Sequence, residues 1–255
     1  ASVKIDYSTD SGSSWTPVIA STTNDGSYSW TVPGTPAANC LVRVADAANA
    51  AITDQSNASF SIVSAIPPAI GLNHTRLNFG KTGAAVTSAQ TLLVRNTGGG
   101  TLAWTATASA GWIVLDKASG SGNASIQVAV NPAGLGNGSY SGTITVADPA
   151  ASNSPQTVTV TLVVKAKGAA PSGLFETPSN NATGVTGSIA VTGWAVDDVE
   201  VTAVKIYRNP LAGEGTAPVY LGDACLVEGA RPDVESLYAT TPFCYRAGWG
   251  YMLLT

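Results

Sequence analysis

The sequence predicts an all-β protein made of three tandem β-sandwich modules, of which the first and the last look incomplete. Short strand-like runs recur along the 255 residues, and turn clusters separate them. Only 11% of the residues are charged, whereas 44% are hydrophobic. Low charge with abundant Thr, Val and Gly fits many short strands joined by tight turns. The hydrophobic content argues against a disordered chain.

The composition also argues against two classes of partner. Lys and Arg form no cluster or stripe, so nucleic-acid binding is not predicted. No apolar run reaches the roughly 20 residues that a membrane-spanning helix needs. We therefore expect no membrane span.

Residues 1–64 form the first predicted module. Its strand-like runs are Val3–Tyr7, Ser27–Val32, Cys40–Ala45 and Ala58–Val63. Four strands fall short of the roughly seven in an immunoglobulin-type sandwich, so the pattern looks incomplete. The segment resembles bacterial surface immunoglobulin-like repeats, on the residues Val3–Trp15, Gly26–Pro33 and Cys40–Asp46.

A short motif lies between the first two of these runs. Ser8, Asp10, Gly12 and Trp15 match the Asp-box pattern of sialidase-type propellers. There the motif is a structural hairpin, with the Asp oxygens tying the turn and the Trp covering it. A single copy does not make a propeller, which repeats it at blade spacing, so the resemblance implies a local turn.

Residues 71–166 form the second predicted module, after a linker at residues 65–70. Seven runs spaced by roughly 8–12 residues are typical of a complete sandwich. They are Leu77–Phe79, Thr91–Asn96, Leu102–Ala108, Trp112–Asp116, Ser125–Val130, Gly142–Ala147 and Thr157–Val164. The last run alternates Thr and Val before it becomes wholly apolar, which indicates one buried face and one solvated face.

This module resembles the BACON-type immunoglobulin-like domain. The matching residues are Leu77–Gly80, Val94–Gly98, Gly111–Ile113, Gly138–Ile144 and Gln156–Val160. The resemblance covers nearly the whole segment, and it implies a fold more than an activity.

Residues 172–255 form the third predicted module, after a linker at residues 167–171. Its runs are Gly187–Ala195, Val201–Arg208, Val219–Ala224 and Trp249–Leu254. It resembles immunoglobulin-like modules appended to large bacterial secreted and surface proteins, on the residues Gly193–Asp198, Ile206–Arg208, Gly229–Glu235 and Ala247–Thr255. Such modules normally continue further, so this one also looks incomplete. An unfinished sandwich exposes strand edges, so we expect neighbouring immunoglobulin-like domains of the same or an adjacent chain as partners.

No catalytic constellation is predicted. The single histidine, His74, stands beside a linker at an expected exposed edge, where nothing in the spacing supports a Ser-His-Asp triad. Loop acids in the third module are most simply solvated carboxylates. A calcium site at Asp197 and Asp198 is the sharper alternative, because hard cations take several loop oxygens. No other cofactor is predicted.

Trp112 is the best candidate for a glycan-stacking side chain. It follows Gly111 directly at a strand start, whereas Trp30, Trp104, Trp194 and Trp249 lie in alternating strands and are expected in cores. Core packing is the alternative for Trp112 as well. Polysaccharide is therefore a candidate partner.

Cys225 and Cys244 flank a turn-rich stretch, and a disulfide between them would indicate an oxidising compartment. Two buried thiols are the alternative. Cys40 alternates like an inward-facing strand residue and is expected to be an inert core thiol.

These expectations together favour a non-catalytic structural region of a bacterial extracellular or cell-surface protein, acting as a stalk, spacer or fibre. Two alternatives remain open. One is a carbohydrate-binding or adhesive module, and the other is an accessory region of a secreted hydrolase.

Overall fold

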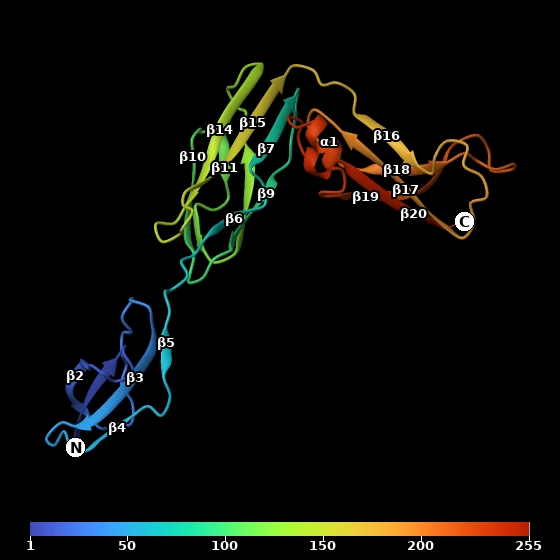
Figure 1. Ribbon diagram of the computed structural model, residues 1–255. Coiled ribbons are helices and arrows are strands. Elements are labelled where there is room, and N and C mark those ends of the chain that lie inside the picture. The colour runs from blue at the N-terminus through green and yellow to red at the C-terminus, as the bar shows by residue number, and fades with distance from the viewer. Residues whose placement is uncertain (255) are drawn as a thin grey trace. The chain divides into compact units, whose positions relative to one another are not determined.

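The computed structural model describes residues 1–254 and divides the chain into two compact units, Ala1–Ile66 and Pro67–Thr255 (Figure 1). Strands make up almost all of its regular structure, with one short α-helix and one 3-10 helix in the described residues. The predicted all-β class is confirmed.

The first unit is one five-stranded sheet. Its order is β2-β1-β3-β4, and β5 pairs with β3. The bounds are β1 (Ser2–Ser8), β2 (Thr16–Thr23), β3 (Ala37–Asp46), β4 (Thr53–Gln55) and β5 (Phe60–Ile62). Along β1 apolar and polar residues alternate, and the carboxylate of Asp6, which is 1% exposed, pairs with Lys4 at 3.0 Å and with Arg43 at 2.9 Å. Burial of a carboxylate is tolerated here because two cations partner it.

The Asp-box residues form the hairpin turn between β1 and β2. The Asp10 carboxylate accepts hydrogen bonds from the backbone N–H and the hydroxyl of Ser14, at 2.8 Å and 2.6 Å. The Ser8 hydroxyl donates to Asp10 at 2.7 Å and accepts from the Gly12 N–H at 2.8 Å. Bonds to the charged form, chiefly from Ser14, lower the pKa of Asp10 to about 2. The motif is thus a structural turn.

The strands of the first unit differ in part from the sequence prediction, which also did not include β4. Residues 27–32 form no strand, and Tyr28 and Val32 are 41% and 49% exposed. Trp30 contacts Tyr7, with ring centroids 5.0 Å apart. The missing strand is replaced by β2, whose apolar and polar residues do not alternate cleanly and which includes Pro17, a residue suited to a sheet edge.

Residues 67–166 form a two-sheet sandwich. One sheet has the order β12-β10-β14-β15-β7-β8 and the other β11-β13-β9-β6. The bounds are β6 (Ile70–Leu72), β7 (Arg76–Thr82), β8 (Ala85–Val86), β9 (Gln90–Asn96), β10 (Ala103–Ala108), β11 (Ile113–Leu115), β12 (Ser119–Ser121), β13 (Ala124–Val130), β14 (Gly138–Ala147) and β15 (Gln156–Lys165). Each of the seven predicted strands is present, with three short additional ones.

The core of this sandwich lies between the two sheets. On β15, Val158, Val160 and Leu162 are fully buried, whereas Thr157 and Thr159 are exposed. This alternation confirms the prediction of one buried and one solvated face over that part of the strand.

Residues 172–254 form a further sheet with the order β16-β17-β20-β19-β18. The bounds are β16 (Ser172–Thr177), β17 (Ser188–Val196), β18 (Val204–Arg208), β19 (Val219–Val227), α1 (Pro232–Leu237), η1 (Cys244–Arg246) and β20 (Gly248–Leu254). Val191, Ile206 and Trp249 form its small core. The sequence prediction missed β16 and α1. Both helices in residues 1–254 are far too short to cross a bilayer.

Leu162→Ala tests the sandwich core. Leu162 is fully buried, so its truncation leaves a cavity and is expected to destabilise the sandwich by about 2–5 kcal/mol. Hydrogen exchange of β14 and β15, followed by mass spectrometry, measures the loss of protection. Thr157→Ala on the solvated face of the same strand is the matched control, with an expected change within about 0.5 kcal/mol. Equal effects of the two substitutions would contradict the assignment of faces.

Candidate functional site

The candidate site is built on β7, whose burial does not alternate. Leu77, Asn78, Phe79 and Gly80 are all buried. Leu77 and Phe79 belong to the sandwich core. Asn78 and Gly80 point to the other face, because successive side chains of a strand alternate. That face is covered by residues 197–246, and we call the contact between the sandwich and these residues the seam.

Asn78 is the central polar residue of the seam. Its Nδ2 donates to the backbone carbonyls of Ala239 at 2.9 Å and Thr241 at 3.3 Å. Its Oδ1 accepts from the Thr161 hydroxyl at 2.7 Å. Asn78 is only 4% exposed, and an unsatisfied amide at such a site would cost about 1–3 kcal/mol. These bonds therefore fix residues 239–241 on the sheet.

Gly80 allows the two backbones to approach closely. A Cβ at this position would lie 1.8 Å from the carbonyl oxygen of Asp198. The Gly80 N–H donates to the Thr87 hydroxyl at 2.8 Å, and that hydroxyl donates to the Val199 carbonyl at 2.8 Å. Thr87 thus joins the sandwich to the turn after β17 at a point where only glycine fits.

Two ion pairs flank these contacts. Lys165 Nζ lies 3.3 Å from Asp198 Oδ2, and Arg246 Nη2 lies 2.6 Å from Glu200 Oε1. The Ala169 N–H also donates to Asp198 at 2.9 Å, and this bond is the main cause that lowers the pKa of Asp198. Ala169 lies in the stretch predicted to be a linker, and this contact ties that stretch to the C-terminal segment.

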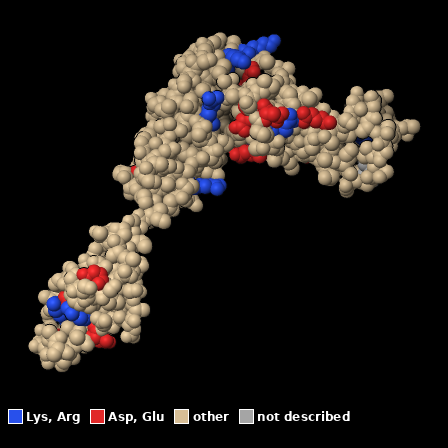
Figure 2. Space-filling model, viewed as in Figure 1, with Lys and Arg blue, Asp and Glu red and all other residues tan. Residues whose placement is uncertain are grey.

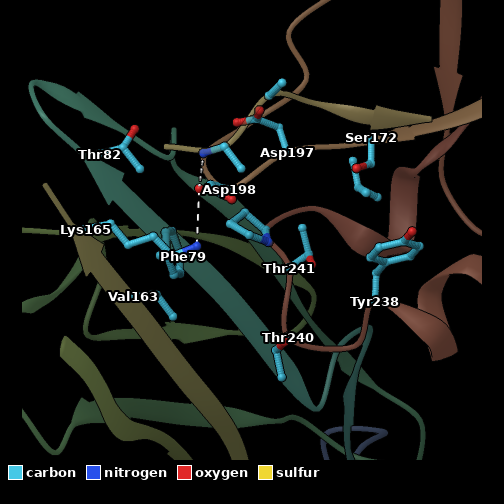
Figure 3. Close-up of a pocket in the computed structure, with 14 residues that line it drawn as sticks. Phe79, Thr82, Val163, Lys165, Ser172, Asp197, Asp198, Tyr238, Thr240 and Thr241 are labelled. Atoms are coloured by element: carbon cyan, nitrogen blue, oxygen red, sulfur yellow. Dashed lines mark hydrogen bonds and ion pairs between the residues drawn. The ribbon is translucent and has the colours of Figure 1, made fainter. Parts of the chain in front are cut away.

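A cavity of about 210 Å³ lies at the seam. Figure 3 shows Asp198 joined to Lys165 there, with Tyr238, Thr240 and Thr241 supplied by the C-terminal segment. Each of the two carboxylates in its lining already accepts backbone hydrogen bonds, Asp198 from Ala169 and Asp197 from the turn that follows it. The carboxylates that line the cavity therefore serve contacts within the protein.

The predicted calcium site is not assembled. Asp197 Oδ1 accepts from the backbone N–H groups of Val199 and Glu200, at 2.8 Å and 3.3 Å, whereas Asp198 turns away to Lys165. Neighbouring carboxylates in the sequence thus serve different contacts. Within residues 1–254, no three His, Cys, Asp or Glu side chains group so as to hold a metal ion.

The structure gives Trp112 a packing role. The side chain is half-buried and packs against the sandwich core, and its carbonyl accepts from the Asn131 N–H at 2.8 Å. This position fits the alternative interpretation, core packing, because the side chain contacts the core instead of standing free on the surface.

The predicted disulfide between Cys225 and Cys244 is wrong for this structure, in which both residues are free thiols. Cys225 lies exposed on β19 opposite Gly250, whereas η1 buries Cys244 at the seam, with its Sγ 3.9 Å from Asn78 Nδ2. Burial raises the pKa of Cys244. Cys40 is fully buried, as expected for a core thiol.

His74 belongs to the seam, which corrects the expectation of an exposed edge. Its side chain is 10% exposed, and its ring packs against Tyr245 in a tilted arrangement, with centroids 4.2 Å apart and an interplanar angle of 36°. Nε2 lies 3.4 Å from Glu228 Oε1. Desolvation lowers the pKa of His74, and Glu228 and Glu235 oppose that shift. Sequence reasoning missed these contacts because the partners are far away along the chain.

A comparison with protein families finds a match within the sandwich. Residues 69–165 match the family model described as the viral BACON domain. The sandwich is thus similar to a BACON domain, and we call residues 67–166 the BACON-type module. The match supports the resemblance of the middle segment, although the sequence resemblances of the flanking segments are to bacterial modules. No curated protein matches the chain.

Several solved structures share weak likeness with the chain. A Bacteroides ovatus GH5 xyloglucanase in complex with a XXXG heptasaccharide is 17% identical, with 38% of this chain and 19% of that chain covered and a TM-score of 0.31. A Porphyromonas gingivalis W83 protein of unknown function is 15% identical over 63% and 84% of the two chains, with a TM-score of 0.32. Mouse Cadherin-23 EC22-24 is 14% identical over 71% and 62%, with a TM-score of 0.28. The chain thus spans about a fifth of the xyloglucanase.

Gly80→Ala tests the close approach at the seam. The new Cβ would clash with the backbone of Asp198, so we expect residues 197–200 to separate from the BACON-type module while its core persists. Faster hydrogen exchange at residues 197–200, with unchanged protection of β15, is the expected result. Gly111→Ala is the matched control, because nothing lies within 4 Å of its Cβ position. Unchanged exchange in Gly80→Ala would contradict the seam.

His74 makes the seam sensitive to pH. Its folded pKa lies below its ordinary value of 6.5, so the stability that it contributes is present above pH 6.5 and is lost as the pH falls through the folded pKa. We expect the melting temperature of the chain to decrease below pH 6.5. His74→Gln, which does not titrate, is expected to flatten that decrease. Parallel melting profiles for the two proteins would show that another group is responsible.

Proposed function

We propose that the chain is a non-catalytic structural region of an extracellular or cell-surface protein, in which β-modules act as a stalk, spacer or fibre. The observation that carries the proposal is the burial of β7 on both faces. One face of β7 packs into the sandwich core and the other packs against the C-terminal segment. Residues 67–254 are therefore connected by more than a linker, as a spacer requires.

The seam is more than a short linker between two free modules. Inter-domain contacts within a chain normally permit relative motion unless the interface is extensive. Here a satisfied buried amide, a glycine-only approach and the Lys165–Asp198 ion pair act at the same interface. Bending at this joint would disrupt these three contacts together, which favours a stiff connection.

Several charged side chains of residues 172–254 form ion pairs and hydrogen bonds within the protein. Arg231 bonds both Asp233 and Glu176, and the first of these partners is the main cause that raises its pKa. Glu200 accepts from Arg246 and from the Ser88 N–H. Acids that are already hydrogen-bonded in this way support a structural role, because a catalytic acid or base must exchange its proton with a substrate.

Strand edges supply surfaces for neighbouring modules. β16 is an edge strand, all six of its residues are exposed, and Leu174 and Phe175 are each 54% exposed. Exposed edges with apolar side chains invite pairing with another strand. We therefore propose neighbouring immunoglobulin-like domains, of the same or an adjacent chain, as partners. The proposal of an extracellular location is supported by the BACON-type match.

Alignment of the two modules in solution tests the spacer. We expect residual dipolar couplings from the BACON-type module and from residues 172–254 to fit one common alignment tensor, because the seam makes them one body. Asn78→Ala removes the central amide and is expected to give two tensors, whereas Gly111→Ala retains one. Two independent tensors in the unaltered protein would overturn the proposal. Labelling of intact producing cells with an antibody to the chain tests the location separately.

A further inference from the structure

The outer face of the β18–β19 hairpin carries two exposed tyrosines that the spacer role does not use. Tyr207 and Tyr220 are 51% and 50% exposed. They are direct cross-strand partners, and their ring centroids lie 5.5 Å apart at an interplanar angle of 59°. The elements that carry them are labelled in Figure 1.

A β-bulge brings a further side chain, that of Asp223, to the same face, where Lys205 already lies. Lys205 pairs with Asp223 and Tyr207 with Tyr220, so β19 has one residue more than β18 between these pairs. In a regular strand, residues 220 and 223 would point to opposite faces. The extra residue restores both to one face, where Lys205 Nζ lies 3.7 Å from Asp223 and 5.3 Å from the Tyr220 ring centroid. Bulges commonly re-aim side chains at functional sites.

The core of the same segment supports the bulge from beneath. The Tyr251 hydroxyl donates to the Leu221 carbonyl at 2.8 Å, and a Cβ on Gly222 would lie 2.7 Å from the Tyr251 ring. Tyr251 belongs to the side chains packed on the core of Trp249. The exposed pair therefore rests on a fixed backbone, which reduces the entropy lost when a ligand binds.

The charges at this face cancel. Lys205 pairs with Asp223, with Lys205 Nζ 3.7 Å from Asp223 Oδ1. Paired opposite charges give no net attraction for an anionic polymer, but they present donors and acceptors beside two apolar rings. A sugar ring has the matching chemistry, with an apolar C–H face and a rim of hydroxyls. Four side chains on a narrow hairpin are too few for the roughly 1,000 Å² of a stable protein interface.

We propose that Tyr207 and Tyr220 form a platform for a neutral polysaccharide, with Lys205 and Asp223 bonding its hydroxyls. The platform lies in the C-terminal segment, away from Trp112 and outside the BACON-type match. It adds a binding activity to a region proposed to be structural, and it does not depend on the stiffness of the seam.

Affinity electrophoresis of the full chain in gels containing xylan, laminarin, mannan or dextran tests the platform. We expect at least one of these neutral polysaccharides to retard the chain. Tyr207→Ala and Tyr220→Ala are each expected to weaken the binding about tenfold, because exposed tyrosines that anchor a ligand carry much of its affinity. Tyr207→Phe keeps the ring and is expected to retain most of the retardation.

Two control variants distinguish binding at the platform from binding elsewhere on the chain. Tyr28→Ala removes a comparably exposed tyrosine of the first unit, 41% exposed, and is expected to leave retardation unchanged. Trp112→Ala tests the competing glycan site and is also expected to leave it unchanged, with folding verified by circular dichroism. No retardation by any of the four polysaccharides, retardation only by anionic polygalacturonate, or loss of binding in Trp112→Ala alone would overturn the proposal.

Discussion

The double burial of β7 is the constraint on which the larger unit depends. Phe79 packs into the sandwich core, and its neighbours Asn78 and Gly80 contact the C-terminal segment. A strand in this position cannot change register without moving apolar side chains out of the core and the amide away from its acceptors. Formation of the core therefore fixes the seam at the same time.

Low charge and local pairing are consistent with this arrangement. Figure 2 shows that most of the visible surface carries no charge. Many of the acids near the seam are used in bonds to basic side chains or backbone N–H groups, as Asp198 and Glu200 illustrate. Such contacts orient segments more than they add stability, because exposed ion pairs contribute only about 0–1 kcal/mol. The dominant stabilisation comes from apolar burial between the sandwich sheets.

The two proposals assign different functions to different parts of the C-terminal segment. Residues 239–241 and η1 contact the BACON-type module, whereas the β18–β19 hairpin presents Tyr207 and Tyr220 on its outer face. A structural region that also binds a neutral polysaccharide would connect a surface protein to a glycan without any chemistry.

The sequence by itself determined the all-β class, the seven sandwich strands, the Asp-box turn and the core position of Cys40, because these follow from local alternation and turn residues. It did not reveal the seam, the burial of His74, the free thiols or the bulge before Asp223. Alternation reports that a strand has two faces, but Asn78 and Gly80 read as solvent-facing until another segment covers them. Only the tertiary structure decided which surface received that segment, since contacts between distant residues leave no periodic signal along the chain.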